Sequence, residues 1–286
     1  MIKKKVNIIP YIRIIRYHNA LMAGLTTFLG YWLSDSSLPL SSVFLLILAT
    51  ICSTGFGNTI NDIYDIDSDR INHPNRPLPQ GAISVLSAWI FSLLLLISAL
   101  VLSFSVSSLH GFATVLPLLL LTIYAFFLKA TPIAGNLLVA TLVAYTILYG
   151  ALGSVGFPRL IFPASMAFFL NFSREIIKDL QDVKGDQASG VITSAFFSVQ
   201  TLRAIIFICS TACLSLLFIT IGMNLFGNLY TVIGLSVILP LHVYRTILIS
   251  RKGIENKFAQ ISTLFKLEML TGLVALAADK LFAGTF

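Results

Sequence analysis

Charged residues are scarce in this chain, and cysteines are few. Only 11% of the 286 residues are charged, whereas soluble proteins average about 25%, so an ordinary soluble domain is excluded. The three cysteines, Cys52, Cys209 and Cys213, have neither metal-ligand spacing nor the pattern of a disulfide framework. The four histidines likewise have no metal or catalytic-triad spacing. No small-residue cleavage site follows Lys3–Lys5 before the first apolar stretch, so we expect no cleavable signal peptide.

Apolar sequence takes the place of charge. Hydrophobic residues make up 57% of the chain, which includes 22 Phe, and the mean hydropathy is +0.90. A membrane-spanning helix needs about 20 apolar residues. Nine stretches approach this length, at about 18–34, 41–61, 84–106, 111–128, 133–153, 160–178, 199–222, 225–248 and 262–283. Backbone groups in lipid must be satisfied within the segment. We therefore predict an all-α integral membrane bundle of nine transmembrane helices around a central cavity, as a single domain over residues 1–286.

Basic residues gather on alternate connections between these stretches. Of the 19 Lys and Arg residues, all except Arg159 and Lys280 fall at the N-terminus or in and beside the even-numbered connections. Cytoplasmic segments carry an excess of Lys and Arg. This distribution predicts a cytoplasmic N-terminus, cytoplasmic even-numbered connections and, after nine spans, a C-terminus outside the cell membrane.

Eight of the twelve acidic residues form two clusters, and each cluster contains Asp-x-x-Asp-x-x-x-Asp. On a helix, the three Asp residues of such a motif lie within about 60° of one another. The first motif is Asp62, Asp65 and Asp69, and the second is Asp179, Asp182 and Asp186. A solvated acidic loop is a sufficient explanation for one cluster, but not for two with identical spacing on the same predicted side of the membrane.

Three carboxylates on one helical face repel one another and need cations. Hard oxygen ligands suit Mg²⁺, which often binds through one or two carboxylates and the phosphates of a substrate. Two Mg²⁺ ions, one on each motif, would hold one diphosphate between them. A polyprenyl diphosphate combines such a head with an apolar tail that suits a membrane bundle. Its allylic C–O bond would break towards a carbocation, which apolar walls protect from water.

These motifs resemble those of the UbiA superfamily of intramembrane prenyltransferases. The first reads Asn61-Asp62-x-x-Asp65-x-x-x-Asp69 and is followed by Asn75-Arg76-Pro77-Leu78-Pro79-Gln80-Gly81, and the second reads Asp179-x-x-Asp182-x-x-x-Asp186. The resemblance covers nearly the whole chain. It implies Mg²⁺-dependent transfer of a prenyl group from its diphosphate to an acceptor.

Within the superfamily, three stretches are most similar to the digeranylgeranylglyceryl phosphate synthase branch: Ile71–Pro77, Arg174–Asp179 and Met22–Gly24. That branch moves a geranylgeranyl group from geranylgeranyl diphosphate to the hydroxyl of geranylgeranylglyceryl phosphate in ether-lipid synthesis. The segment Ala188–Thr193 departs from the Thr-Leu-Pro-like turn of many relatives. The aspartates are shared with relatives that act on aromatic acceptors, so a quinone, tocopherol or chlorophyll precursor stays open as the acceptor.

Ten further residues are predicted to bind the substrates or support the aspartates: Arg16, Asn19, Asn58, Asn61, Arg76, Tyr124, Lys129, Asn171, Arg174 and Lys178. Arg76 lies on a loop stiffened by prolines, which favours a fixed guanidinium facing the diphosphate. Lys129 is the only charge in its connection, and diphosphate binding competes with snorkelling as its explanation. Its neighbour Tyr124 lies in a stretch that also looks like the family's. Arg174 and Lys178 either contact the diphosphate or neutralise the second cluster.

Asn58 and Asn61 precede the first motif and are expected to support its metal site. Arg16 and Asn19 open the first apolar stretch, and each either contacts the substrate or takes part in an interhelical hydrogen bond. Asn171 has the same two explanations. A membrane transporter is an alternative of another class. It is disfavoured because the carboxylates lie at one end of the spans, whereas transporters usually place such groups near the midplane.

Overall fold

The computed structural model describes residues 7–128, 131–188, 190–251 and 253–282, and the regular structure in them is helical throughout. Seven helical segments are long and apolar enough to cross a membrane: Leu40–Tyr64, Val85–Val106, Ser108–Leu128, Phe157–Ala188, Val199–Gly222, Asn228–Ser250 and Phe258–Leu281. Each of the nine expected stretches overlaps a helix. The first and fifth coincide with α2 (Tyr17–Leu33) and α7 (Ala134–Gly150), which have 17 residues each. The chain is thus an all-α, multi-pass membrane protein.

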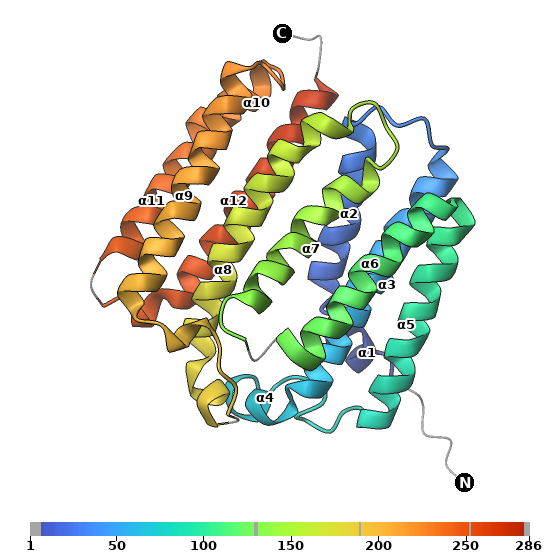
Figure 1. Ribbon diagram of the computed structural model, residues 1–286, viewed down its shortest axis with the longest axis vertical. Coiled ribbons are helices and arrows are strands. Elements are labelled where there is room, and N and C mark those ends of the chain that lie inside the picture. Colours follow the sequence, from blue (N-terminus) through green and yellow to red (C-terminus); the bar gives the residue numbers. More distant parts are fainter. Residues whose placement is uncertain (1–6, 129–130, 189, 252, 283–286) are drawn as a thin grey trace. The chain divides into compact units, whose positions relative to one another are not determined.

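The chain divides into two compact units, and the first comprises residues 1–25, 40–128 and 184–191. Its main body is formed by α3 (Leu40–Tyr64), α5 (Val85–Val106) and α6 (Ser108–Ile123), which all pack against one another (Figure 1). The core between them contains Phe56, Ile60, Ala99 and Leu118. A π-helical turn, η1 (Tyr124–Leu128), continues α6. The short helix α1 (Ile9–Ile14) packs against α3.

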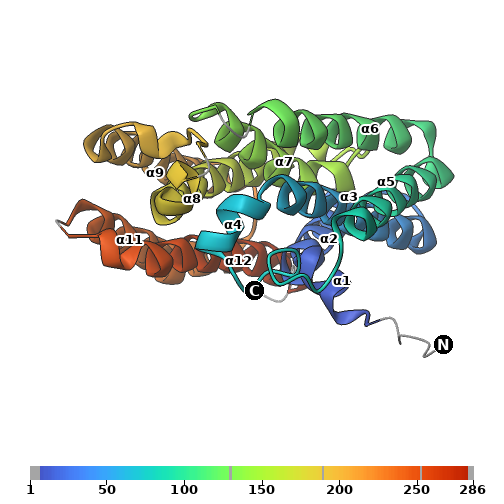
Figure 2. The same ribbon diagram turned by 90° about the horizontal axis from the view of Figure 1, so that it is seen from below.

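The second unit comprises residues 26–39, 129–183 and 192–286. It holds α7, most of α8 (Ile161–Ala188), α9 (Val199–Gly222), α10 (Asn228–Ile233), α11 (Leu239–Ser250) and α12 (Phe258–Leu281). A π-helical turn, η4 (Gly234–Ile238), joins α10 to α11. Figure 2 shows α11 and α12 side by side. The end of α2 and α7 approach each other backbone to backbone at Gly30 and Gly150, where a Cβ atom would overlap a carbonyl oxygen of the facing helix.

The two aspartate motifs compare differently with the helical geometry expected from their spacing. The sixth apolar stretch ends at residue 178, but α8 continues to Ala188, so the second motif lies on one helix, as expected. Residues 179–184 contain no Gly or Pro that would end it. The first motif was expected on one helix. The helix is broken at Asp65, where φ is −93° and ψ is 2°, and α4 (Ile66–Asn72) follows.

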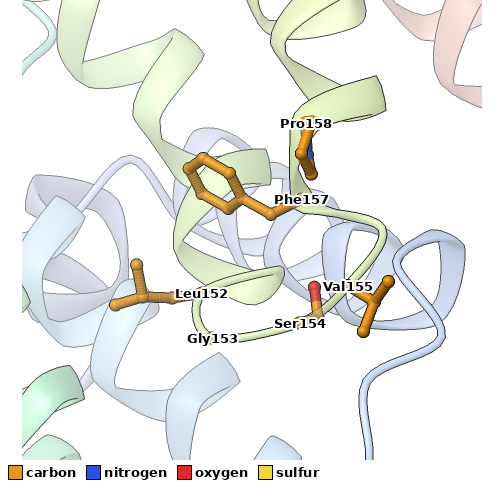
Figure 3. Close-up of a pocket in the computed structure, with 6 residues that line it drawn as sticks. All are labelled: Leu152, Gly153, Ser154, Val155, Phe157 and Pro158. Atoms are coloured by element: carbon orange, nitrogen blue, oxygen red, sulfur yellow. The ribbon is translucent and has the colours of Figure 1, made fainter.

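A shallow depression opens on the loop that precedes α8, and it is lined by Leu152, Gly153, Ser154, Val155, Phe157 and Pro158 (Figure 3). The second aspartate motif lies near the opposite, C-terminal end of α8. This depression is therefore not the predicted diphosphate site.

Candidate functional site

The three carboxylates of the first motif are all buried, although the helix that carries them is broken. Asp62, in the last turn of α3, is 2% exposed; Asp65, at the break, is 7% exposed; Asp69, on α4, is 3% exposed. The intervening Asp67 instead points to the outside and pairs with Arg70. Hydrogen bonds from the amides of Asp65 and Asp69 to the carbonyls four residues earlier bridge the break. The break therefore leaves the common burial of the motif intact.

Two guanidinium groups bind these carboxylates directly. Nη2 of Arg16 lies 2.5 Å from Oδ1 of Asp62, and Nη1 of Arg76 lies 2.6 Å from Asp69 and 3.3 Å from Asp62. Arg16 has a φ of 50° at the corner between α1 and α2. Both side chains are about one quarter exposed. Arg16 thus forms an ion pair with the motif. Arg76 was predicted to face the diphosphate, and in the structure it forms ion pairs with Asp62 and Asp69.

The position of the loop that carries Arg76 is fixed by hydrogen bonds from residues outside the predicted site. Arg13 on α1 donates a hydrogen bond of 2.6 Å from Nη2 to the carbonyl of Asn75. Backbone hydrogen bonds from Gln80 to Arg76 and from Ala82 to Pro77 close the turn. From the sequence, Arg13 was expected only to be one of the cytoplasmic charges near the N-terminus. Its position one helical turn before Arg16 was the available signal.

Burial raises the pKa of Asp69 above its ordinary value, and the neighbouring Asp62 raises it further, while Arg76 acts in the opposite direction. Desolvation penalises the charged form, and a like charge does the same. Burial and the neighbouring carboxylate therefore disfavour a negative charge on Asp69. A divalent cation beside the carboxylates would favour the charged form.

The two asparagines of the first motif have different partners. Asn61 donates a hydrogen bond of 2.8 Å from Nδ2 to Oδ2 of Asp65, and its buried Oδ1 accepts none from a described residue. A buried oxygen without a donor, beside carboxylates, fits a hard cation. Asn58, expected to support the metal, instead donates from Nδ2 to the carbonyl of Ile15, 2.9 Å away. This hydrogen bond fixes the backbone next to Arg16, at the corner between α1 and α2.

The second motif is anchored through Asp179. Its Oδ2 accepts hydrogen bonds from Nδ2 of Asn136 (2.8 Å), from Oγ of Ser194 (2.6 Å) and from the amide of Ser194 (3.1 Å). This joins α8 to the start of α7 and to the turn at Ser194. Neither Asn136 nor Ser194 was predicted, since nothing in their local sequence marks them as partners of Asp179. Asp182 and Asp186 are partly exposed, and Asp186 belongs to the same compact unit as the first motif.

The other predicted residues have varied surroundings. Arg174 and Lys178 both pair with Glu175, at 2.9 and 2.8 Å, so they neutralise the residue that precedes the second motif. Asn171 is buried, and its Nδ2 donates to no described residue. Asn19 is exposed, and Tyr124 is partly buried at the start of η1. Lys129 lies outside the described residues.

An interior ion cluster occupies the middle of α9, α11 and α12. Glu268 accepts from Nε of Arg245 at 2.8 Å and lies 2.5 Å from Nδ1 of His242. Arg245 is fully buried, reaches Oγ of Ser210 at 3.3 Å and stacks on Phe265, 4.0 Å from the ring centre. Arg245 was counted with the basic residues beside the even-numbered connections, but its charge is paired inside the second unit. An arginine within an apolar stretch was the available signal.

The interior ion cluster also includes metal-ligand types. The ligand atoms of Cys213, His242 and Glu268 lie within 4.8 Å of one another. The Arg245 guanidinium, however, already neutralises the Glu268 carboxylate. A divalent cation here would meet a fully buried positive charge. The cluster is balanced by its own side chains.

The long apolar helices are those of a membrane protein, and buried carboxylates lie at the end of one of them. The chain belongs to the UbiA prenyltransferase family, whose model matches residues 23–267. A digeranylgeranylglyceryl phosphate synthase of Methanosphaera stadtmanae is 34% identical over 95% of this chain and 99% of that protein. The synthase of Metallosphaera sedula is 33% identical over 95% and 96%.

Solved structures agree with this assignment. A structure described as digeranylgeranylglyceryl phosphate synthase in membranes has a TM-score of 0.77 and 26% identity, over 95% of this chain and 97% of that chain. A UbiA homologue from Archaeoglobus fulgidus, bound to DMAPP and Mg²⁺, has a TM-score of 0.65 and 23% identity, over 93% and 99%. The second likeness shows the fold.

Proposed function

We propose that the protein transfers a geranylgeranyl group from geranylgeranyl diphosphate to the free hydroxyl of geranylgeranylglyceryl phosphate, in ether-lipid synthesis. The reaction class rests on one observation: a member of this family buries three carboxylates around two partly exposed guanidinium groups. The choice of acceptor is supported by likeness to the synthases of Methanosphaera stadtmanae and Metallosphaera sedula over nearly their whole length.

Asp62, Asp65 and Asp69 would hold one Mg²⁺, and Asp179, Asp182 and Asp186 a second. All six ligands are hard carboxylate oxygens, and the unpaired Oδ1 of Asn61 adds a seventh oxygen beside Asp65. Asp179 uses only Oδ2 for hydrogen bonds among the described residues, which leaves Oδ1 as its ligand atom. When bound, the ions neutralise charge on the diphosphate as it leaves.

The chain's own residues would supply binding, orientation and exclusion of water. Arg16 and Arg76 offer guanidinium N–H groups that match phosphate oxygens. Arg174, Lys178 and Lys129 add positive charge around the diphosphate.

In the reaction itself, the C1–O bond of the prenyl diphosphate breaks, and the diphosphate departs with the electron pair. The acceptor hydroxyl then bonds to C1 of the allylic cation. Its proton passes to a carboxylate or to the released diphosphate.

The proposal includes an arrangement in the membrane. All nine apolar stretches cross as spans of one domain around a cavity, with the N-terminus and the aspartate motifs cytoplasmic and the C-terminus outside. The alternation of Lys and Arg between connections supports this even without Arg245.

The test is an assay of the purified protein with Mg²⁺, geranylgeranyl diphosphate and a panel of acceptors, with products identified by mass. The panel contains geranylgeranylglyceryl phosphate, 4-hydroxybenzoate, a naphthoate and chlorophyllide. We expect product from geranylgeranylglyceryl phosphate alone, and none with EDTA. If product formed only with an aromatic acceptor, the proposed acceptor would be wrong, while the proposed prenyl transfer would stand.

Asp65→Ala and Asp182→Ala should abolish turnover while the protein still folds. Asp67→Ala is the matched control, because Asp67 lies within the first cluster but is exposed and paired with Arg70. Retained turnover in Asp65→Ala would refute the metal assignment.

A further inference from the structure

A contact between two motif-bearing segments lies within the first compact unit. The last turn of α8, from residue 184 onward, belongs to this unit rather than to the unit that holds the rest of the helix. The amide of Gly185 donates a hydrogen bond of 3.0 Å to Oδ1 of Asn72, the last residue of α4. The end of α8 and the short helix α4 lie next to each other in both views (Figures 1 and 2).

Glycine at position 185 leaves room for this contact, and a side chain there would displace the side-chain amide of Asn72. A Cβ atom there would lie 2.5 Å from Cγ and 2.7 Å from Oδ1 of Asn72, well inside normal contact distances. Glycine is a poor helix former, yet Gly185 lies within α8. The close approach of Asn72 supplies the reason for glycine at this helical position.

The two partners are adjacent to metal ligands of the proposed site. Asn72 follows Asp69 by three residues, and Gly185 directly precedes Asp186. The helix α4 has only seven residues, and an isolated helix of that length is unstable in water. Contacts with its surroundings must therefore fix the position of α4, and with it that of Asp69.

We infer that Asn72 and Gly185 are positioning residues that set Asp69 and Asp186, which belong to the same compact unit, at the spacing needed to share one Mg²⁺-diphosphate. This inference rests on the proposed function. Neither residue contacts the substrate in this role. Asn72 fixes the end of α4 against α8, and Gly185 allows the two helices to approach.

The test compares Gly185→Ala, Asn72→Ala and the double variant. The readouts are the Mg²⁺ concentration for half-maximal turnover and the melting temperature without ligands. Gly185→Ala should raise the half-maximal Mg²⁺ concentration by about tenfold or more, as outer-shell changes at metal sites do. Its melting temperature should hold or rise, because alanine favours the helix. A merely structural role would lower the melting temperature and leave the Mg²⁺ dependence unchanged.

The double variant tests whether the two residues act through each other. With Asn72 truncated, the added methyl group has no side chain to displace, so the double variant should be no worse than the worse single variant. Gly272→Ala is the control, since Gly272 is a helical glycine with open space around it. Its Mg²⁺ dependence should match that of the parent protein, and its melting temperature should hold or rise for the same helical reason.

Wild-type Mg²⁺ dependence in Asn72→Ala, or strictly additive effects in the double variant, would overturn the inference. If Gly185→Ala does not fold, Asn72→Ala alone tests the positioning role, because it removes the hydrogen-bond acceptor of the Gly185 amide without adding a larger side chain. The proposed function fails separately, through turnover in Asp65→Ala. An unchanged Asn72→Ala beside an inactive Asp65→Ala would refute only the positioning role.

Discussion

The first aspartate motif and the interior ion cluster both bury carboxylates in an apolar protein, but their charges are balanced differently. In the interior ion cluster, one carboxylate, Glu268, meets a fully buried Arg245 and His242. In the first motif, three carboxylates meet two guanidinium groups that remain about one quarter exposed. The interior cluster is closed and charge-balanced, as a structural element should be. The first motif instead keeps partly exposed guanidinium groups beside its buried carboxylates, which agrees with the proposal that it binds a ligand.

The largest effect is expected at Asp69, where a substitution should lower turnover without lowering the melting temperature. Burial already disfavours its charge, so the neutral isostere Asp69→Asn should not lower the melting temperature. Turnover should fall by at least about 100-fold, a loss typical of removing one charge-stabilising group. Turnover and thermal unfolding in detergent measure the two effects. The proposed difference between the two clusters would be refuted if Asp69→Asn kept its turnover, or if its melting temperature lay well below that of the parent protein. Asp67→Asn is the control.

The opposite result is expected in the interior ion cluster. Arg245→Met leaves Glu268 buried without its main cation, and breaking a buried pair in this way costs about 3–5 kcal/mol. The melting temperature should fall by roughly 10 °C, while the folded fraction keeps its turnover per molecule. Adding Glu268→Met should restore most of the loss, because apolar replacement of both partners is often neutral. If the double variant were as unstable as the single one, the cluster would not be a self-balanced pair.

The smallest effect is expected at an exposed ion pair. Asp35 accepts hydrogen bonds from Lys280 and Arg159, and Lys280 in particular holds the pKa of Asp35 below its ordinary value. A lowered carboxyl pKa contributes stability at neutral pH, which is lost as the pH falls below about 4. The Asp35 side chain is 62% exposed, so Asp35→Asn should shift the melting temperature by less than about 2 °C. Melting curves between pH 3 and pH 7 measure this effect. A large shift in melting temperature would show that the Asp35 ion pairs stabilise the fold as strongly as buried ones.

Local patterns in the sequence predicted the features that depend on neighbouring residues. Apolar length located the helices, and the three-and-four spacing located the aspartates. The break at Asp65 was not predictable, because the residues around it carry no Gly or Pro. The helical geometry of the second motif was predicted from its spacing, but the apolar stretch ends at residue 178 and by itself does not show where α8 ends.

Contacts between distant residues were beyond sequence reasoning. Arg245 and Glu268 lie 23 positions apart on separate helices, and Asn72 and Gly185 lie 113 apart. No spacing rule links such pairs, since the folded backbone alone brings them together. Arg16 was considered for an interhelical bond, but its partner Asp62 was assigned only to metal.

The bare backbones at Gly30 and Gly150 limit how mutations in this protein can be interpreted. Lipid provides no hydrophobic force to press helices together, so close contact depends on dispersion between surfaces that fit. Even one methyl group at either glycine would wedge the end of α2 away from α7. Inactivity after such a change would report a bundle that never assembled, so these two positions are unsuitable as probes of catalysis.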